Sequence, residues 1–289
     1  MKFPLSLIRS GALALTLVAA AEVCAQSPRL TMGVYPGVES GQESFEVMER
    51  FLPLARYLSS KIGIQVLLVP VRVPSAAMRS MIQGDTSYQL FFGPPIFASQ
   101  AIHKAGFVPI VVEEERIRGV FVAKQTSKLE GLKDFTPATS IVMPSPGLLL
   151  TILANETLTQ QNITPAAGKR TYSDTAEGIV LALNNDIAEV AVMRDRTAQK
   201  LISSQQPPRF KIVGLTADAP GFGLIAHKAV SEDVRAKLRR AALGLNGDSA
   251  ALAVEVRAGL RTSPFVASHS DDFAPLQRMM EAAALASGK

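Results

Sequence analysis

Short apolar runs alternate with amphipathic stretches through the N-terminal third of the chain. The stretch 43–62 places its apolar residues on one helical stripe, whereas the apolar runs beside it are short and rich in β-branched or aromatic residues, which favour strands. Glycine or proline stands at most of the boundaries, as expected where elements end. The pattern predicts strands at 30–35, 64–71, 88–92 and 107–112, and helices at 43–62, 76–83 and 96–105.

The alternation continues to the C-terminus. Strand-like runs and helical stripes follow one another without an internal repeat or a long low-complexity segment. Strands that alternate with helices form parallel pairs through right-handed crossovers, so the sequence predicts an α/β fold of doubly wound, mostly parallel sheets. The predicted strands are 118–124, 140–143, 169–172, 187–193, 211–214 and 222–227, and the predicted helices are 148–161, 175–184, 231–245, 250–260 and 272–286.

The run YQLFFGPPIF, residues 88–97, combines a strand, a sharp turn and a helix start. Two prolines prevent a central strand from continuing, and Gly93 allows a tight turn or a close approach. Ligands of open α/β sheets lie at the carboxyl ends of strands. Phe92, Gly93 and Pro94 are therefore candidate binding residues, with Tyr35 and Pro36 at the end of the first strand. The alternative is an ordinary βα loop.

Three further strand ends carry polar residues. Ser145 and Gly147 lie in a turn before a predicted helix, whose free amide groups and partial positive charge favour anions. Ser173 and Asp174 follow the next strand, and Arg194 follows the one after that, where its guanidinium can bind a carboxylate or phosphate with two hydrogen bonds. The alternatives are helix caps at Ser145 and Asp174, and for Arg194 either a surface ion pair with Asp195 or a solvated helix start.

The N-terminal segment 1–25 has the pattern of a secretory signal peptide. Lys2 and Arg9 flank the start of an apolar stretch at 11–21, and small residues precede Gln26, where we expect cleavage. The apolar stretch is too short for an ordinary membrane span. Cys24 is the single cysteine, and Val23 before it argues against a lipid anchor. Cleavage removes this thiol, which excludes disulfides and cysteine chemistry from the mature chain.

Composition and charge narrow the function classes. Apolar residues make up 47% of the 289 residues, enough for two lobes with their own cores, and the net charge is +5. The predicted signal peptide carries +1 of this, and the remaining basic residues are scattered, which argues against a nucleic-acid partner. The three histidines lack metal-ligand spacing, and no phosphate-binding glycine loop or nucleophile motif occurs. We therefore expect no metal, no cofactor and no enzymatic activity.

Several segments, taken in order, carry a family resemblance. The chain resembles the phosphate/phosphite/phosphonate-type periplasmic substrate-binding proteins of ABC importers over nearly all of its predicted mature length. No single motif is diagnostic, and the resemblance lies in the order and spacing of the segments LTMGVYPG, FLPLARYLSSKIG, VLLVPV, QLFFGPPIFASQA, KLEGLKDF and RTSPFVASHSDDFAPLQRM.

The resemblance implies a two-lobed fold with a hinge of two crossing strands. It implies a monomer that captures a small anionic ligand in the periplasm and delivers it to an ABC permease. It predicts a first lobe of residues 26–117 plus 222–289 and a second lobe of 118–221. The hinge is expected at the polar connector 218–221.

This chain departs from the family pattern at the expected oxyanion donors. The family's Ser-Thr-Ser-Gly type turn is replaced by Pro144-Ser145-Pro146-Gly147, an aromatic hydroxyl by Phe92, and a histidine by Asp174. A carboxylate such as Asp174 repels an anion, and a buried charge with few donors is costly. The departures leave a second hypothesis open, in which the same fold senses a ligand for a membrane histidine kinase or cyclase.

Overall fold

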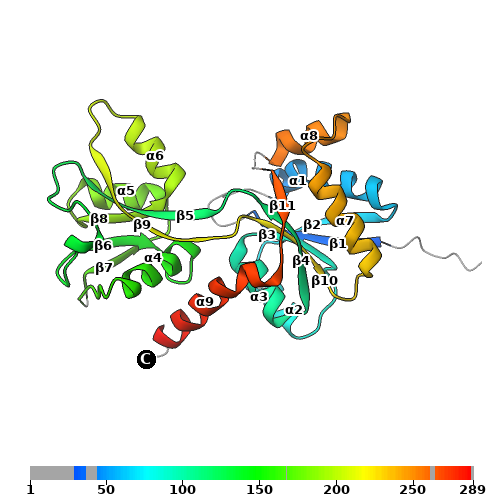
Figure 1. Cartoon of the computed structure of the whole chain (residues 1–289), viewed down its shortest axis with the longest axis horizontal. Coiled ribbons are helices and arrows are strands. Elements are labelled where there is room, and N and C mark those ends of the chain that lie inside the picture. The colour runs from blue at the N-terminus through cyan, green and yellow to red at the C-terminus, as the bar shows by residue number, and fades with distance from the viewer. Residues whose placement is uncertain (1–28, 37–43, 167, 261–263, 288–289) are drawn as a thin grey trace, which may run out of the picture.

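The protein has two lobes, each built on its own β-sheet (Figure 1). A computed structural model describes residues 29–36, 44–166, 168–260 and 264–287. The predicted signal peptide, 1–25, and Gly37 of the first strand-end loop lie outside these residues. The two-lobed α/β fold predicted from the sequence is confirmed.

The sheet of the first lobe has the strand order β11-β4-β10-β3-β1-β2. Helices α1 (Ser44–Ile62), α7 (Glu232–Gly244) and α8 (Ala251–Leu260) cover one face and bury Phe51 and Leu238 against it. Helices α2 (Pro74–Ile82) and α3 (Pro95–Lys104) cover the other face around Phe91. The strands are β1 (Arg29–Val34), β2 (Gln65–Pro70), β3 (Leu90–Gly93), β4 (Phe107–Glu113), β10 (Gly223–His227) and β11 (Phe265–Ala267).

The sheet of the second lobe has the order β7-β6-β8-β5-β9. Helix α4 (Leu149–Gln160) and the short helix η2 (Leu132–Asp134) pack on one face, and α5 (Ala176–Asn184) and α6 (Asp195–Ser203) pack on the other. Each face is apolar, so the inner strands of this sheet are mostly buried on both sides, whereas its two edge strands are partly exposed. The strands are β5 (Ile117–Lys124), β6 (Ile141–Pro144), β7 (Arg170–Ser173), β8 (Val190–Arg194) and β9 (Phe210–Ala219).

Both sheets are mixed, with a parallel part formed by consecutive strand–helix units. In the first lobe β1 is parallel to β2 and β3, while β10 runs antiparallel to β3 and β4. In the second lobe β6 is parallel to β7 and β8, while β5 runs antiparallel to β8 and β9. The antiparallel strands β5 and β10 follow the two chain crossings between the lobes. Within each parallel part the carboxyl ends share one edge.

The chain crosses between the lobes twice, from β4 to β5 and from β9 to β10, and the two crossings lie against each other. The amide of Glu113 donates to the carbonyl of Phe222 over 2.8 Å. A Cβ atom on Gly221 would lie 2.7 Å from the carbonyl oxygens of Glu113 and Glu115. Only glycine fits at this distance, because real Cβ contacts do not come so close.

Helix α9 (Ala274–Ser287) follows a 3₁₀ turn, η3 (Ser270–Phe273), and bridges the lobes (Figure 1). On the first lobe, the Ser99 hydroxyl of α3 donates to Gln277 Oε1 over 3.3 Å. On the second lobe, Leu276 and Met280 pack in one apolar cluster with Ile152 and Leu153 of α4. The C-terminal helix is therefore anchored to both lobes.

Removing the α9 contact is expected to destabilise the whole protein. Leu276 is 2% exposed, so Leu276→Ala leaves a cavity beside α4 and should lower the free energy of unfolding by about 2–4 kcal/mol. Arg278→Ala, on the exposed side of the same helix, should change it by less than about 0.5 kcal/mol. Chemical denaturation of both variants measures the difference. Equal stabilities would show that α9 is not packed on the second lobe.

Candidate functional site

The carboxyl ends of β1 and β3 bring two of the predicted binding segments together. These strands are parallel neighbours, with Val34 opposite Phe92. The amide of Tyr35 donates to the carbonyl of Phe92 over 3.0 Å. Tyr35 and Pro36 therefore lie beside Gly93 and Pro94 at one edge of the sheet, as the sequence predicted for strands sharing a carboxyl edge.

The ring of Phe92 does not reach this edge. It is 1% exposed and lies in the first-lobe core, with ring-centroid distances of 5.5 Å to Phe51 and 6.1 Å to Phe265. Only the main chain of Phe92 takes part in the edge, through its carbonyl. Packing also favours glycine at position 93, because a Cβ there would lie 2.7 Å from the Phe91 ring.

Tyr35 supplies the aromatic hydroxyl at this edge. It packs partly against the apolar cluster beneath α2 and α3. Burial raises the pKa of its phenol above the usual value, so the hydroxyl stays protonated near neutral pH and can donate a hydrogen bond.

The second lobe gathers its predicted residues at the carboxyl edge of β6, β7 and β8. Pro144 lies opposite Ser173 in the β6–β7 pair, and β6 is parallel to β8, which ends at Arg194. The Ser145 hydroxyl donates a short hydrogen bond to Asp174 Oδ1. The predicted residues Ser145, Ser173, Asp174 and Arg194 therefore share one edge, and Ser145 is bonded to Asp174.

The capping alternatives for Ser145 and Asp174 are wrong. The N-cap of α5 is Thr175, whose side chain accepts from the Gly178 amide over 3.0 Å. The N-cap of α4 is Leu148, which has no side-chain acceptor. The turn before α4 has Gly147 at φ +84°, a conformation that favours glycine.

Arg194 ends β8 with donors that the protein does not fully use. Its side chain is 23% exposed, and its Nε is buried with no partner among the described residues. Its Nη2 lies 4.0 Å from Glu115 Oε1, which is an ion pair but too long for a hydrogen bond. The alternative of an ion pair with Asp195 is wrong, because Asp195 instead accepts from the Arg196 amide over 2.7 Å and the ion-pair partner of Arg194 is Glu115.

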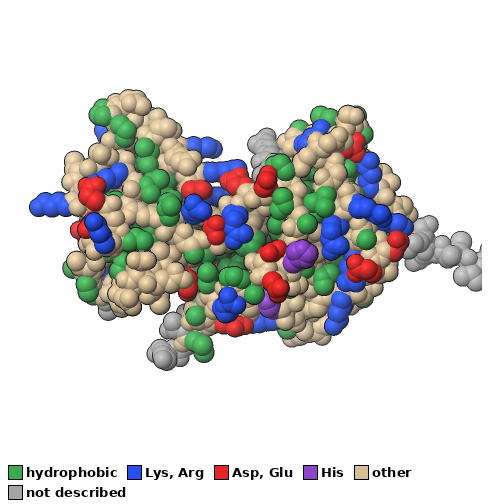
Figure 2. Space-filling model, in the orientation of Figure 1, with side chains coloured by type: hydrophobic (Ala, Val, Ile, Leu, Met, Phe, Trp, Pro, Cys, Tyr) green, Lys and Arg blue, Asp and Glu red, His purple; other side chains and the backbone are tan. Residues whose placement is uncertain are grey.

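Two acidic residues at the first crossing were not found by sequence reasoning. Glu113 ends β4, and Glu115 lies on the crossing itself, where it also pairs with Arg196. The acidic run at 113–115 between two apolar strands was the available signal. Figure 2 shows that the outline is notched between the lobes and that acidic and basic side chains gather beside the notch.

Glu113 is a buried carboxyl. Its residue is 7% exposed, and desolvation raises its pKa from 4.5 to about 7. A hydrogen bond from the Phe222 amide and the positive charges of Arg194, Arg50 and Arg196 act in the opposite direction. Burial outweighs these attractions, so the proton is held more tightly in the folded protein than in the unfolded chain.

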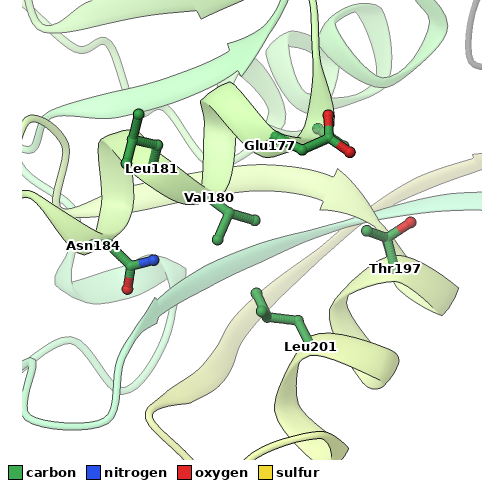
Figure 3. Close-up of a pocket in the computed structure, with 7 residues that line it drawn as sticks. Glu177, Val180, Leu181, Asn184, Thr197 and Leu201 are labelled. Atoms are coloured by element: carbon green, nitrogen blue, oxygen red, sulfur yellow. The ribbon is translucent and has the colours of Figure 1, made fainter.

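A shallow groove on the second lobe lies elsewhere. It runs between α5 and α6 and is lined by Val180, Leu181 and Leu201, with Glu177, Asn184 and Thr197 around it (Figure 3). None of the predicted binding residues lines it. Across the described residues, we find no cluster of three metal-ligating side chains and no helix that is both long and apolar enough to cross a bilayer.

Solved structures define the class of fold. A binding-protein component of an ABC phosphonate transporter from Pseudomonas aeruginosa is similar at 19% identity, with 90% of this chain and 89% of that chain covered and a TM-score of 0.60. PhnD1 from Prochlorococcus marinus, solved with methylphosphonate, is similar at 14% identity, with 88% and 97% covered and a TM-score of 0.63. The fold is that of two-lobed periplasmic binding proteins.

A third structure extends the likeness, and a sequence comparison assigns the family. The aliphatic sulphonate binding protein SsuA from Escherichia coli is 15% identical, with 89% and 91% covered and a TM-score of 0.54. The family of phosphonate ABC transporter periplasmic substrate-binding proteins matches residues 37–273. The chain belongs to this family of periplasmic, ligand-binding partners of ABC transporters. No protein of curated function matches its sequence.

The pH dependence of the free energy of unfolding should show the raised pKa of Glu113. A carboxyl with a pKa of about 7 when folded and about 4.5 when unfolded stabilises the protein fully below about pH 4.5. This contribution, about 3 kcal/mol, is lost as the pH rises through about 7. Glu113→Gln cannot ionise, so its free energy of unfolding should fall less between about pH 5 and pH 8.

Urea unfolding at several pH values measures this slope. Glu114→Gln is the matched control, because Glu114 is exposed on the same crossing and its loss should leave the slope unchanged. A slope in Glu113→Gln as steep as in the wild type would show that Glu113 is ionised throughout.

Proposed function

We propose that the protein captures a small anionic ligand between its two lobes and presents it to an ABC permease. The observation that carries this proposal is Arg194, a partly buried arginine at a strand end whose Nε has no partner among the described residues. An oxyanion is the ligand class that satisfies such a donor, with two parallel hydrogen bonds where Nη2 also takes part.

The two strand-end edges would hold the ligand from opposite sides. The turn at Ser145 and Gly147 offers backbone amides at the start of α4, and Tyr35 offers a hydroxyl from the first lobe. The binding residues of this proposal are Tyr35, Pro36, Phe92, Gly93, Pro94, Ser145, Gly147, Ser173, Asp174 and Arg194, with Phe92 contributing its main chain.

The hinge of this proposal is the pair of crossings. Lobe 1 then comprises residues 26–117 plus 222–289, and lobe 2 comprises 118–221. Short crossings that lie against each other can absorb a rotation by changing a few backbone angles while the sheets stay rigid. The closed form would be the one that the permease recognises, and the protein would act as a monomer in the periplasm after cleavage near Ala25.

Asp174 limits the choice of ligand. Its carboxylate already accepts a hydrogen bond from Ser145, so that hydroxyl is oriented toward the acid. A ligand at this edge must tolerate a nearby negative charge, which a protonated oxyanion or a weak organic acid does better than a dianion. The proposed ligands are phosphonate-like or phosphate-like anions, other oxyanions and organic acids.

A screen of anions tests the function. Phosphate, phosphite, methylphosphonate, methanesulfonate and small carboxylates are added one at a time at millimolar concentration, and thermal unfolding is followed. A ligand at about 100 times its Kd should stabilise the protein by about 2.7 kcal/mol, because it binds only the folded state. No shift with any of these anions would overturn the proposed capture.

Arg194 should account for much of the affinity. Arg194→Ala is expected to weaken binding of the anion found in the screen by about 2–4 kcal/mol, because one partner of a desolvated charge pair is lost. Arg194→Lys should recover only part of this, since an ammonium lacks the planar fork. Titration calorimetry of both variants gives the dissociation constants.

Arg209→Ala is the control for this measurement. Arg209 is exposed at the start of β9, at the end of the sheet opposite to Arg194, as the strand registers show. Its replacement removes the same charge from the protein without touching the edge. An Arg194→Ala variant that binds as tightly as Arg209→Ala would remove Arg194 from the site.

A further inference from the structure

The crossings between the lobes hold a buried carboxyl at their point of contact. The amide of Glu113 donates to the carbonyl of Phe222 on the opposite crossing over 2.8 Å, and the Phe222 backbone lowers the pKa of the Glu113 carboxyl. Gly221 lies against its Cβ at a distance that admits no side chain. The environment of Glu113 therefore depends on how the two crossings lie together.

The positive charges of three guanidinium groups, which come from three different elements, lower the pKa of this carboxyl. Arg50 of α1 is fixed by hydrogen bonds to the carbonyls of Gly259, at 3.1 Å, and Leu260, at 2.7 Å. Arg194 comes from the end of β8 and Arg196 from the start of α6, and both face the acidic Glu115 on the crossing. Arg50 belongs to the first lobe, whereas Arg194 and Arg196 belong to the second.

We infer that capture of an anion at Arg194 is coupled to protonation of Glu113 at the crossing of the lobes. The inference rests on the proposed function, because it takes Arg194 as the anion's partner. An anion at this guanidinium cancels the contribution of Arg194 to the positive field that favours the ionised Glu113, while Arg50 and Arg196 keep theirs. The ligand's own negative charge acts in the same direction, and so does any further loss of water as the lobes close.

The pKa of Glu113 lies close to neutral pH, so the coupling changes its protonation in that range. Its pKa of about 7 leaves the group partly protonated before the ligand arrives. If the anion raises this pKa by about one unit, about half a proton is taken up per ligand near pH 7.5, and the affinity falls about tenfold from low to high pH. Glu115 is paired with Arg196 and is more exposed than the buried Glu113, so the comparison with Glu113→Gln assigns the proton that is taken up.

Calorimetry in buffers of different ionisation enthalpy tests the coupling. The probes are methylphosphonate and methanesulfonate at about pH 7.5, titrated into the wild type, Glu113→Gln and Glu114→Gln. The buffer dependence of the binding heat gives the number of protons taken up. Methanesulfonate stays ionised in this range, and protonation of methylphosphonate itself is common to all three proteins and cancels in the comparison.

We expect proton uptake in the wild type and in Glu114→Gln, and a loss of about half a proton per ligand in Glu113→Gln. Equal uptake in all three proteins, with binding retained, would overturn the inference and leave the proposed function standing. Failure of the wild type to bind either probe, or any anion of the screen, would overturn the proposed function and this inference together.

A second measurement needs neither a ligand nor the Glu113 variant. Arg194→Gln removes the same positive charge that the anion would cancel, so the pH range in which stability falls should move upward in the ligand-free protein. Arg209→Gln should leave that range unchanged. An unshifted pH profile in Arg194→Gln would show that Arg194 does not act on Glu113 and would overturn the coupling.

Discussion

The fold depends on the close contact of the two crossings between its lobes. Gly221 lies so near the carbonyls of Glu113 and Glu115 that any side chain would push the crossings apart. The backbone bond between Glu113 and Phe222 fixes their register. Since each crossing leads directly into sheet strands, this contact also sets how the carboxyl edges of the two sheets are placed relative to each other.

Acidic and basic side chains lie beside this contact, and their geometry decides which of them are closely paired. Glu115 takes a close ion pair with Arg196 but lies 4.0 Å from Arg194. At that distance Arg194 forms an ion pair without a hydrogen bond, and its Nε has no partner among the described residues. Glu115 therefore pairs closely with Arg196 and leaves the Nε of Arg194 available for the proposed anion.

Local pattern predicted most of the elements, because apolar periodicity and glycine or proline boundaries act over a few residues. It missed β11, whose three residues pair with β4 far away in the sequence, and α6, whose polar stripe resembles a loop. The carboxyl ends of the parallel strands were predicted to share an edge, and within each sheet they do. The direction of the Phe92 ring was not predicted. Phe91 and Phe92 are both buried, and the sequence does not tell which of them faces which side of the sheet.

Helix α9 constrains any movement of the lobes. On α3 it is held by the directional bond between Ser99 and Gln277, whereas on α4 it is held by the apolar contacts of Leu276 and Met280. Hydrogen bonds tolerate little displacement, but apolar side chains can slide over one another at small cost. Closure of the lobes would therefore carry α9 with the first lobe and shift it along α4, the helix that begins at the Ser145–Gly147 turn. The C-terminal helix and the proposed anion site would then respond to the same rotation.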